Sequence, residues 1–82
     1  MGISRDFGVL LREARDRVGI SQEELAFRAD LHRTYVSMVE RGIHCPTLKA
    51  LFGLCRALDI KPASIVASLE ARVATRRAKK SV

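Results

Sequence analysis

The sequence has no long run of apolar residues, because charged side chains interrupt each apolar stretch after a few positions. A membrane-spanning helix needs about 20 consecutive apolar residues, and a secretory signal needs an apolar region of about 7–15. We therefore expect neither segment, no membrane partner, and a cytoplasmic location. A chain of 82 residues has room for one compact domain with one modest core, which argues against an elaborate enzyme.

Cysteine and histidine are scarce, with two residues of each. Cys45 and Cys55 lack the C-x-x-C spacing of zinc and redox sites, and the two histidines do not complete a ligand set. The sequence also has no glycine-rich phosphate loop and no nucleophile beside an evident base. We therefore predict no catalytic residue, no bound metal and no cofactor. Cys55 is expected in the core as a small apolar side chain.

Positive charge is unevenly distributed along the chain, whose formal net charge is +6. Residues 1–70 hold ten lysines and arginines and all nine acids, whereas residues 71–82 hold five basic residues and no acid. Such an excess suggests a polyanionic partner. Two explanations for the basic end stay open: a solvated tail that aids solubility, or an extension that binds phosphates.

Apolar residues recur at helical spacing along most of the chain, which predicts an all-α fold. Ser4, Ser21 and Thr47 are expected N-caps. Gly19 and Gly42 are expected to end helices, because glycine adopts the left-handed conformation that often follows a last turn. The expected helices cover about residues 5–18, 22–29, 32–41 and 48–58, and a fifth begins at Pro62 and continues into the basic end.

For two residues inside these helices the sequence predicts the local packing. Gly8 lies within the first helix, where glycine costs about 1 kcal/mol relative to alanine, so it indicates close packing at that point. Leu48 begins the apolar stripe of the fourth helix and is expected to face the core.

The stretch from Gln22 to Arg41, QEELAFRADLHRTYVSMVER, has the pattern of two helices joined by a tight turn. Such a pair needs a small residue where the helices cross, and Ala26 supplies it. The inner faces need apolar residues, and the outer face of the second helix needs polar ones. The inner residues are Leu25, Ala29, Leu31, Val36 and Val39, and the outer residues are Arg33, Thr34, Ser37 and Arg41.

Over residues 5–70 the chain resembles the phage-repressor and Cro-like helix-turn-helix family, also called the Xre family. The resemblance rests on LREAR before Gly19, SQEELA, ERG at 40–42, PTL at 46–48 and LDI at 58–60. It implies a five-helix, lambda-repressor-like DNA-binding domain over residues 1–70, followed by a basic extension over residues 71–82. The string LHRTYV-x-x-VERG further resembles the controller proteins of restriction–modification systems. Asp30 departs from the family pattern, which often has glycine in the turn.

The resemblance also implies roles for individual residues in binding double-stranded DNA. Gln22 would bond a backbone phosphate and brace the second helix of the motif. Arg33, Thr34 and Ser37 would face base edges, and the Arg33 guanidinium can donate two bonds to one guanine. For two more residues alternatives stay open: Tyr35 would reach a phosphate or pack against the neighbouring helix, and Arg41 would touch a phosphate or pair near Glu40.

Two further expectations follow from the resemblance. Arg15 and Glu40 match a structural ion pair between the first helix and the end of the third. A single module of this size buries too little surface for high discrimination, so a homodimer on paired half-sites is expected. Its interface would use apolar residues of the fifth helix, although two of them, Ile65 and Leu69, would otherwise close the domain's own core. The four interface candidates are Ile65, Val66, Leu69 and Val73.

The leading functional hypothesis is a sequence-specific transcriptional regulator of bacterial or phage type. The alternative is an antitoxin-like or adaptor protein that uses the fifth helix and the basic end to hold another protein. An enzyme is a third class with little support, because pairing a histidine with either cysteine rests on residue type alone.

Overall fold

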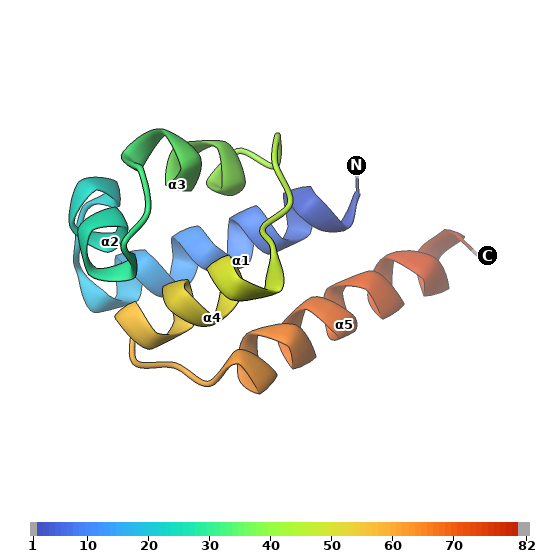
Figure 1. Ribbon diagram of the computed structural model, residues 1–82. Coiled ribbons are helices and arrows are strands. Elements are labelled where there is room, and N and C mark those ends of the chain that lie inside the picture. The colour runs from blue at the N-terminus through green and yellow to red at the C-terminus, as the bar shows by residue number, and fades with distance from the viewer. Residues whose placement is uncertain (1, 81–82) are drawn as a thin grey trace.

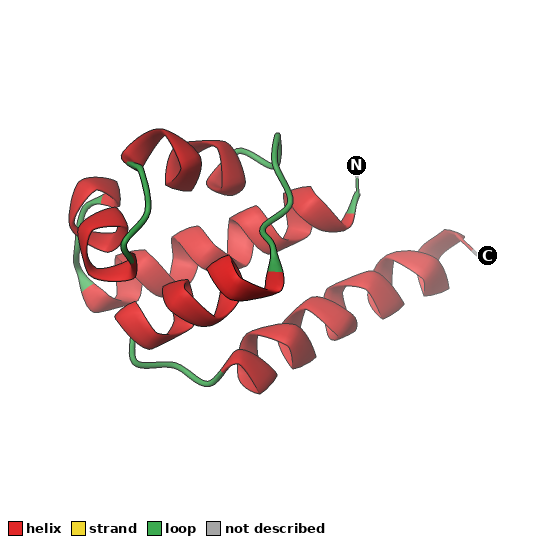
Figure 2. Ribbon diagram, viewed as in Figure 1, coloured by secondary structure: helices red, strands yellow, loops and turns green. Residues whose placement is uncertain are grey.

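The computed structural model describes residues 2–80, with side chains for residues 2–77, and consists of five helices (Figure 1). No strand occurs among the described residues (Figure 2), and the predicted five-helix, all-α fold is confirmed. Ser81 and Val82, the last residues of the predicted basic extension, lie outside the described residues. The helices are α1 (Ile3–Val18), α2 (Gln22–Ala29), α3 (Arg33–Glu40), α4 (Leu48–Ala57) and α5 (Pro62–Lys80).

Two of the predicted N-caps are confirmed and one is wrong. Ser21 Oγ accepts a hydrogen bond from the Glu24 backbone N–H at 3.0 Å, and Thr47 Oγ1 accepts one from the Ala50 N–H at 3.1 Å. Ser4 lies inside α1 instead, because the helix already begins at the residue before it. The N-cap is Gly2, whose carbonyl accepts the first backbone hydrogen bonds of α1.

Residues with left-handed backbone conformation end the first two helices. Gly19 follows α1 with φ of 84°, and Asp30 follows α2 with φ of 57°. Asp30 therefore takes up the conformation for which the family often uses glycine, at a modest steric cost for a residue with a Cβ. The turn leaves only Leu31 and the N-cap His32 before α3 begins.

The core is built from all five helices. Cys55 is buried as predicted, and burial raises the pKa of its thiol. The expectation that Leu48 faces the core is wrong, since Leu48 is 75% exposed in the first turn of α4. The largest fully buried side chains are Leu11, Leu25, Val36, Val39, Leu54 and Cys55.

The long helix α1 lies in the middle of the molecule and contacts both α3 and α5. Helix α2 packs against α3 and α4, and α5 lies on the side of α1 and α4 that faces away from α3 (Figure 1). The arrangement leaves the outer face of α3 uncovered by the described residues. None of the described helices is long and apolar enough to cross a membrane.

Candidate nucleic-acid interface

The turn between α2 and α3 brings the two helices together at a small side chain. Ala26 is buried where they cross, and its carbonyl accepts a bond from the Leu31 backbone N–H at 2.8 Å. Val36 and Val39 then point into the core and hold α3 against α1 and α2. The opposite face of α3 is left to solvent.

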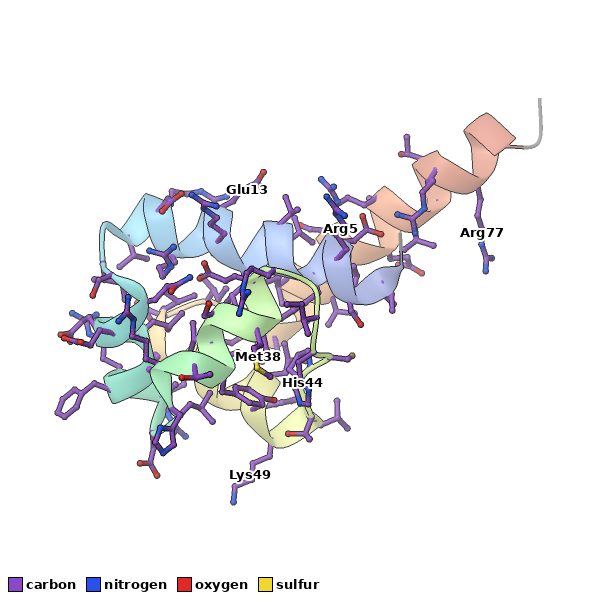
Figure 3. The ribbon with its side chains drawn as sticks, turned by 90° about the horizontal axis from the view of Figure 1, so that it is seen from above. Arg5, Glu13, Met38, His44, Lys49 and Arg77 are labelled. Carbon is purple, nitrogen blue, oxygen red and sulfur yellow. The ribbon has the colours of Figure 1, made fainter. Side chains whose placement is uncertain are left out.

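The outer face of α3 carries Thr34, Met38 and Arg41, which lie four and three positions apart and so share one side of the helix. Thr34 and Arg41 are exposed, whereas Met38 and the neighbouring Ser37 are half-buried. Figure 3 looks down on this face and shows Met38 on the side of α3 toward His44. Met38 is absent from the predicted interface residues, although its spacing from Thr34 was the signal that could have included it.

Arg33 lies at the edge of this face, in the first turn of α3, and is exposed. It borders a shallow hollow that Gln22 and Glu23 at the start of α2 also line. Arg41 donates from Nε to the Ser37 carbonyl at 3.4 Å, a long bond within its own helix. Both guanidinium groups therefore remain accessible beside the outer face.

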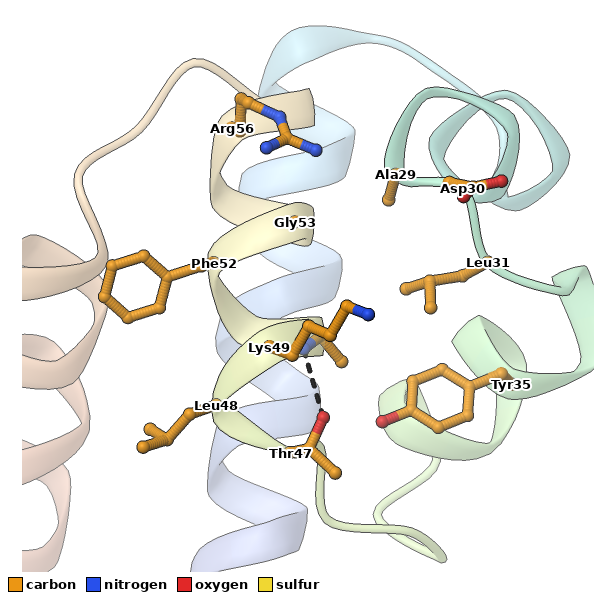
Figure 4. A pocket seen from close by; sticks show the side chains of 11 residues that line it. Ala29, Asp30, Leu31, Tyr35, Thr47, Leu48, Lys49, Phe52, Gly53 and Arg56 are labelled. Carbon is orange, nitrogen blue, oxygen red and sulfur yellow. Dashed lines mark hydrogen bonds between the residues drawn. The ribbon is translucent and has the colours of Figure 1, made fainter.

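Tyr35 packs at the margin of the core rather than standing free in solvent. Its ring meets the His44 ring edge to face, with centroids 5.2 Å apart. The Tyr35 hydroxyl is buried and has no hydrogen-bond partner among the described residues. It lies in a groove between α3 and α4 that Thr47 and Lys49 also line (Figure 4). Contacts of Tyr35 with the core and His44 thus agree with a packing role.

The Glu40 carboxylate joins three helices at the carboxyl end of α3. Arg15 of α1 donates from Nε and Nη2 to the two Glu40 oxygens, at 2.7 and 3.0 Å, and the side chain of Glu40 is 3% exposed. Gln22 of α2 donates from Nε2 to the same carboxylate at 3.0 Å. The bonds to Glu40 raise the pKa of the Arg15 guanidinium. Because each donor comes from a different helix, this network fixes the direction of α3.

Glycine allows a close approach where α1 supports α3. A Cβ added to Gly8 would lie 2.5 Å from the carbonyl oxygens of Val39 and Glu40, so only glycine fits without a shift. The tight packing expected at Gly8 is therefore confirmed. Gly42 follows α3 with φ of 76°, and a Cβ there would lie 2.7 Å from the Cα of Arg5. The end of α3 thus rests directly on the first turns of α1.

A tight turn, a supported second helix and an uncovered outer face make up this motif, and a profile of the family described as helix-turn-helix matches residues 11–65. The chain belongs to the helix-turn-helix family. Helix α3 is the second helix of the motif.

Individual helix-turn-helix proteins are similar to this chain in sequence and in structure. The chain is 39% identical to Control protein C.BamHI of Bacillus amyloliquefaciens over 61 residues, which cover 73% of this chain and 75% of that protein. It is 45% identical to the restriction-modification controller protein C.AhdI from Aeromonas hydrophila, whose structure matches with a TM-score of 0.74 over 76% of this chain and 94% of that one. The predicted resemblance to controller proteins is confirmed.

A second similar structure contains DNA. It is the restriction-modification controller protein C.Esp1396I, crystallised as a tetramer with its natural 35 base-pair operator. That chain is 25% identical to this one, with a TM-score of 0.78, and the match covers 87% of this chain and 93% of the other.

The four predicted interface residues of α5 fall into different environments in the helix-turn-helix domain. Ile65 is buried in the core and Leu69 packs against it, whereas Val73 is half-buried and Val66 is 45% exposed. Several large apolar residues outside the predicted interface are more exposed than these, among them two on α4, Leu48 and Phe52, the latter at 58%. Both leave α4 on its side toward α5 (Figure 4).

The described residues contain no group of three or more histidine, cysteine or acidic side chains that could hold a metal ion. Cys45 is exposed in the loop before α4.

Proposed function

We propose that this helix-turn-helix protein is a transcriptional regulator that places α3 in the major groove of double-stranded DNA. The single observation that carries the proposal is the uncovered outer face of α3, held in one direction by the Glu40 network. A helix docked this way contacts base edges with its first turns while the preceding helix crosses the backbone. The named relatives are regulators and controllers, and they lend no support to the antitoxin-like or adaptor alternative.

Arg33 and Thr34 are the proposed base-reading residues, with Ser37 beside them. Arg33 has a planar fork that matches the two acceptors of guanine in the major groove. Gln22 has two amide hydrogens, of which one is bonded to Glu40, so the second is available to meet a phosphate. We propose that Gln22, by contacting a phosphate, fixes the position of the protein on DNA. Arg33, by contacting a base, would determine which sequence is preferred.

Protein–protein contact is proposed to pair two copies through α4 and α5. Leu48, Phe52 and Val66 are large apolar side chains that the described fold leaves exposed. Leu48 and Phe52 leave α4 on the side away from α3 (Figure 4). Exposed apolar residues that gather on one side of a domain mark protein interfaces. Val73 extends the same surface along α5, whereas Ile65 serves the domain's own core.

The relatives give this proposal a more specific form, a controller-type regulator that assembles on its operator. Two of the named controller proteins match more than nine-tenths of their own length, and one was crystallised as a tetramer on DNA. We propose that this chain also binds paired half-sites as a dimer or a pair of dimers, in the cytoplasm.

Selection of bound sequences from a random duplex library tests the DNA-reading proposal. We expect enrichment of one motif made of two inverted half-sites, because a two-fold symmetric dimer presents two copies of α3. Recovery of sequences with no shared motif would contradict sequence-specific reading.

Sedimentation of the free protein at micromolar concentration tests the interface. We expect a dimer for the wild type and a shift toward monomer for Phe52→Asp, because a charge in an apolar interface is costly. Phe27→Asp is the matched control, since Phe27 is also exposed but lies on α2, away from the proposed interface. Equal dimer stability in the two variants would contradict the proposal that α4 forms part of the interface.

A further inference from the structure

Asp6 is a charged residue that the described fold buries, at 6% exposed, and it lies in the first turns of α1. Its carboxylate oxygens accept hydrogen bonds from Arg72 Nε at 3.4 Å and from Arg76 Nη1. The arginines are four positions apart, so they project from one side of α5. One carboxylate near the start of the chain therefore holds two arginines near its end.

The second half of α5 is mostly exposed. From residue 70 to residue 77 only Val73 and Arg76 are half-buried, and the other side chains are exposed. A helix segment of this length is marginal without tertiary contacts, because helix formation needs packing to offset its entropic cost. The hydrogen bond from Arg76 is the main cause that holds the pKa of Asp6 below its ordinary value, with a smaller contribution from Arg72. The Asp6–Arg72–Arg76 cluster is thus an ionised contact at ordinary pH.

Helix α1 connects this cluster to the DNA-reading helix. Its middle supports α3 through Gly8 and through the bonds of Arg15 to Glu40. Its first turns hold the far half of α5 through Asp6. The direction of α5 is therefore set by the same helix that fixes the direction of α3.

We propose that Asp6 is a positioning residue that sets the direction of α5, and through it the distance between the two α3 helices of the dimer on DNA. The inference rests on the proposed dimer and names the residue that fixes its geometry. A second consequence concerns charge. Arg72 and Arg76 are held by a carboxylate, so they are not among the cations that the basic extension offers to phosphates.

The test compares Asp6→Asn with Asp16→Asn. The two substitutions remove the same charge from the same helix, but the Asp16 side chain is 64% exposed and lies 3.7 Å from Arg15. Amide hydrogen exchange on the free protein reports how α5 is held. We expect Asp6→Asn to speed exchange in the second half of α5 by about tenfold or more while the exchange of α3 stays unchanged, and Asp16→Asn to change neither.

Selection from a duplex library with a randomised gap between two copies of the selected half-site reports geometry on DNA. We expect the wild type and Asp16→Asn to prefer one gap, and Asp6→Asn to accept several gaps with the same half-site bases. An α5 that stays protected in Asp6→Asn, or an unchanged gap preference, would overturn the inference.

Two further outcomes are decisive. If Asp6→Asn does not fold, Arg76→Gln removes one donor and leaves the Asp6 carboxylate in place, and this variant must broaden the gap preference for the inference to stand. If the wild type selects no paired half-sites, the proposed dimeric function fails and the inference falls with it. A single preferred gap in the wild type that survives in Asp6→Asn and Arg76→Gln would instead overturn the inference alone.

Discussion

The helix-turn-helix segment and the region that begins with α5 differ in their net charge and in the contacts that hold them in place. Residues 21–42 contain four acids and three arginines, a net charge of −1, whereas residues 62–82 contain one acid and five basic residues, a net charge of +4. The surface proposed to read DNA is therefore not the most basic part of the chain. Net charge promotes association with any polyanion, but base reading needs a few donors in fixed positions.

The two regions are also anchored differently. Helix α3 buries Val36 and Val39 and ends on the Glu40 network, which connects it to two other helices. Residues 70–77 of α5 are mostly exposed, and the Asp6 carboxylate holds them at one side. The element that is proposed to place donors within a groove is thus held by more buried contacts than the far half of α5.

The largest expected effect on stability follows from removing the Glu40 network that holds α3 in place. Glu40→Ala should lower the free energy of unfolding by about 3–5 kcal/mol, because it leaves the partly buried Arg15 guanidinium without its carboxylate. Chemical denaturation measures it, with Glu24→Ala as control. The Glu24–Arg28 pair is about half exposed, so its removal should cost about 0.2–1 kcal/mol. Equal destabilisation in the two variants would contradict the structural role of Glu40.

A smaller effect is expected from crowding the contact between α1 and α3. Gly8→Ala places a methyl group against the carbonyls of Val39 and Glu40 and should destabilise the fold by about 1–3 kcal/mol. Gly2→Ala is the control: nothing lies within 4 Å of a Cβ there, so a loss of stability in that variant reports the N-cap and not crowding. An unchanged melting temperature in Gly8→Ala would contradict this expectation, because it would mean that α1 and α3 move apart at little cost in stability.

A still smaller effect should sharpen the description of the reading face. Met38 lies between Thr34 and Arg41 on that face and can contact the methyl group of thymine. Replacing one operator thymine with deoxyuridine should weaken wild-type binding by about 0.8 kcal/mol, the value of one buried methyl-sized group. Met38→Ala should bind both duplexes equally. A wild type that is insensitive at every thymine would exclude this contact.

The smallest effect on recognition is expected from shortening α5. Deletion of residues 78–82 removes Lys79 and Lys80 but leaves Arg72 and Arg76 in place. Affinity for cognate and unrelated duplexes should fall by the same factor, and the slope of binding against salt should decrease by about 0.9 for each phosphate that these lysines neutralise. An unchanged slope would identify the basic end as a solvated tail.

Most of the fold could be predicted from the sequence because it depends on local signals. Serine and threonine caps, a glycine stop and helical spacing of apolar residues each act within one or two turns. The prediction for Ser4 was wrong because a backbone carbonyl, that of Gly2, accepts the first bonds of α1. The prediction for Leu48 was wrong because spacing alone does not show where the core ends.

The candidate site was less predictable, since it depends on contacts between distant residues. The bond from Gln22 to Glu40 and the cluster of Asp6 with two arginines join positions 18 to 70 apart. No local pattern marks such partners. The resemblance to a known family supplied Arg15 and Glu40, and the spacing from Thr34 could have supplied Met38, whereas Asp6 and Phe52 required the folded arrangement.

The central claim, that α3 reads bases while charge elsewhere only strengthens association, is tested most directly at Arg33. Wild type, Arg33→Ala and Gln22→Ala are titrated at one fixed salt concentration against the cognate duplex and its single-base variants. Arg33→Ala should weaken binding by about 1–3 kcal/mol per half-site, and discrimination should vanish at one base-pair position. Gln22→Ala should reduce affinity equally for all duplexes. If Arg33→Ala instead weakens every duplex uniformly and keeps its base preference, Arg33 contacts phosphate and the assignment of the reading face is wrong.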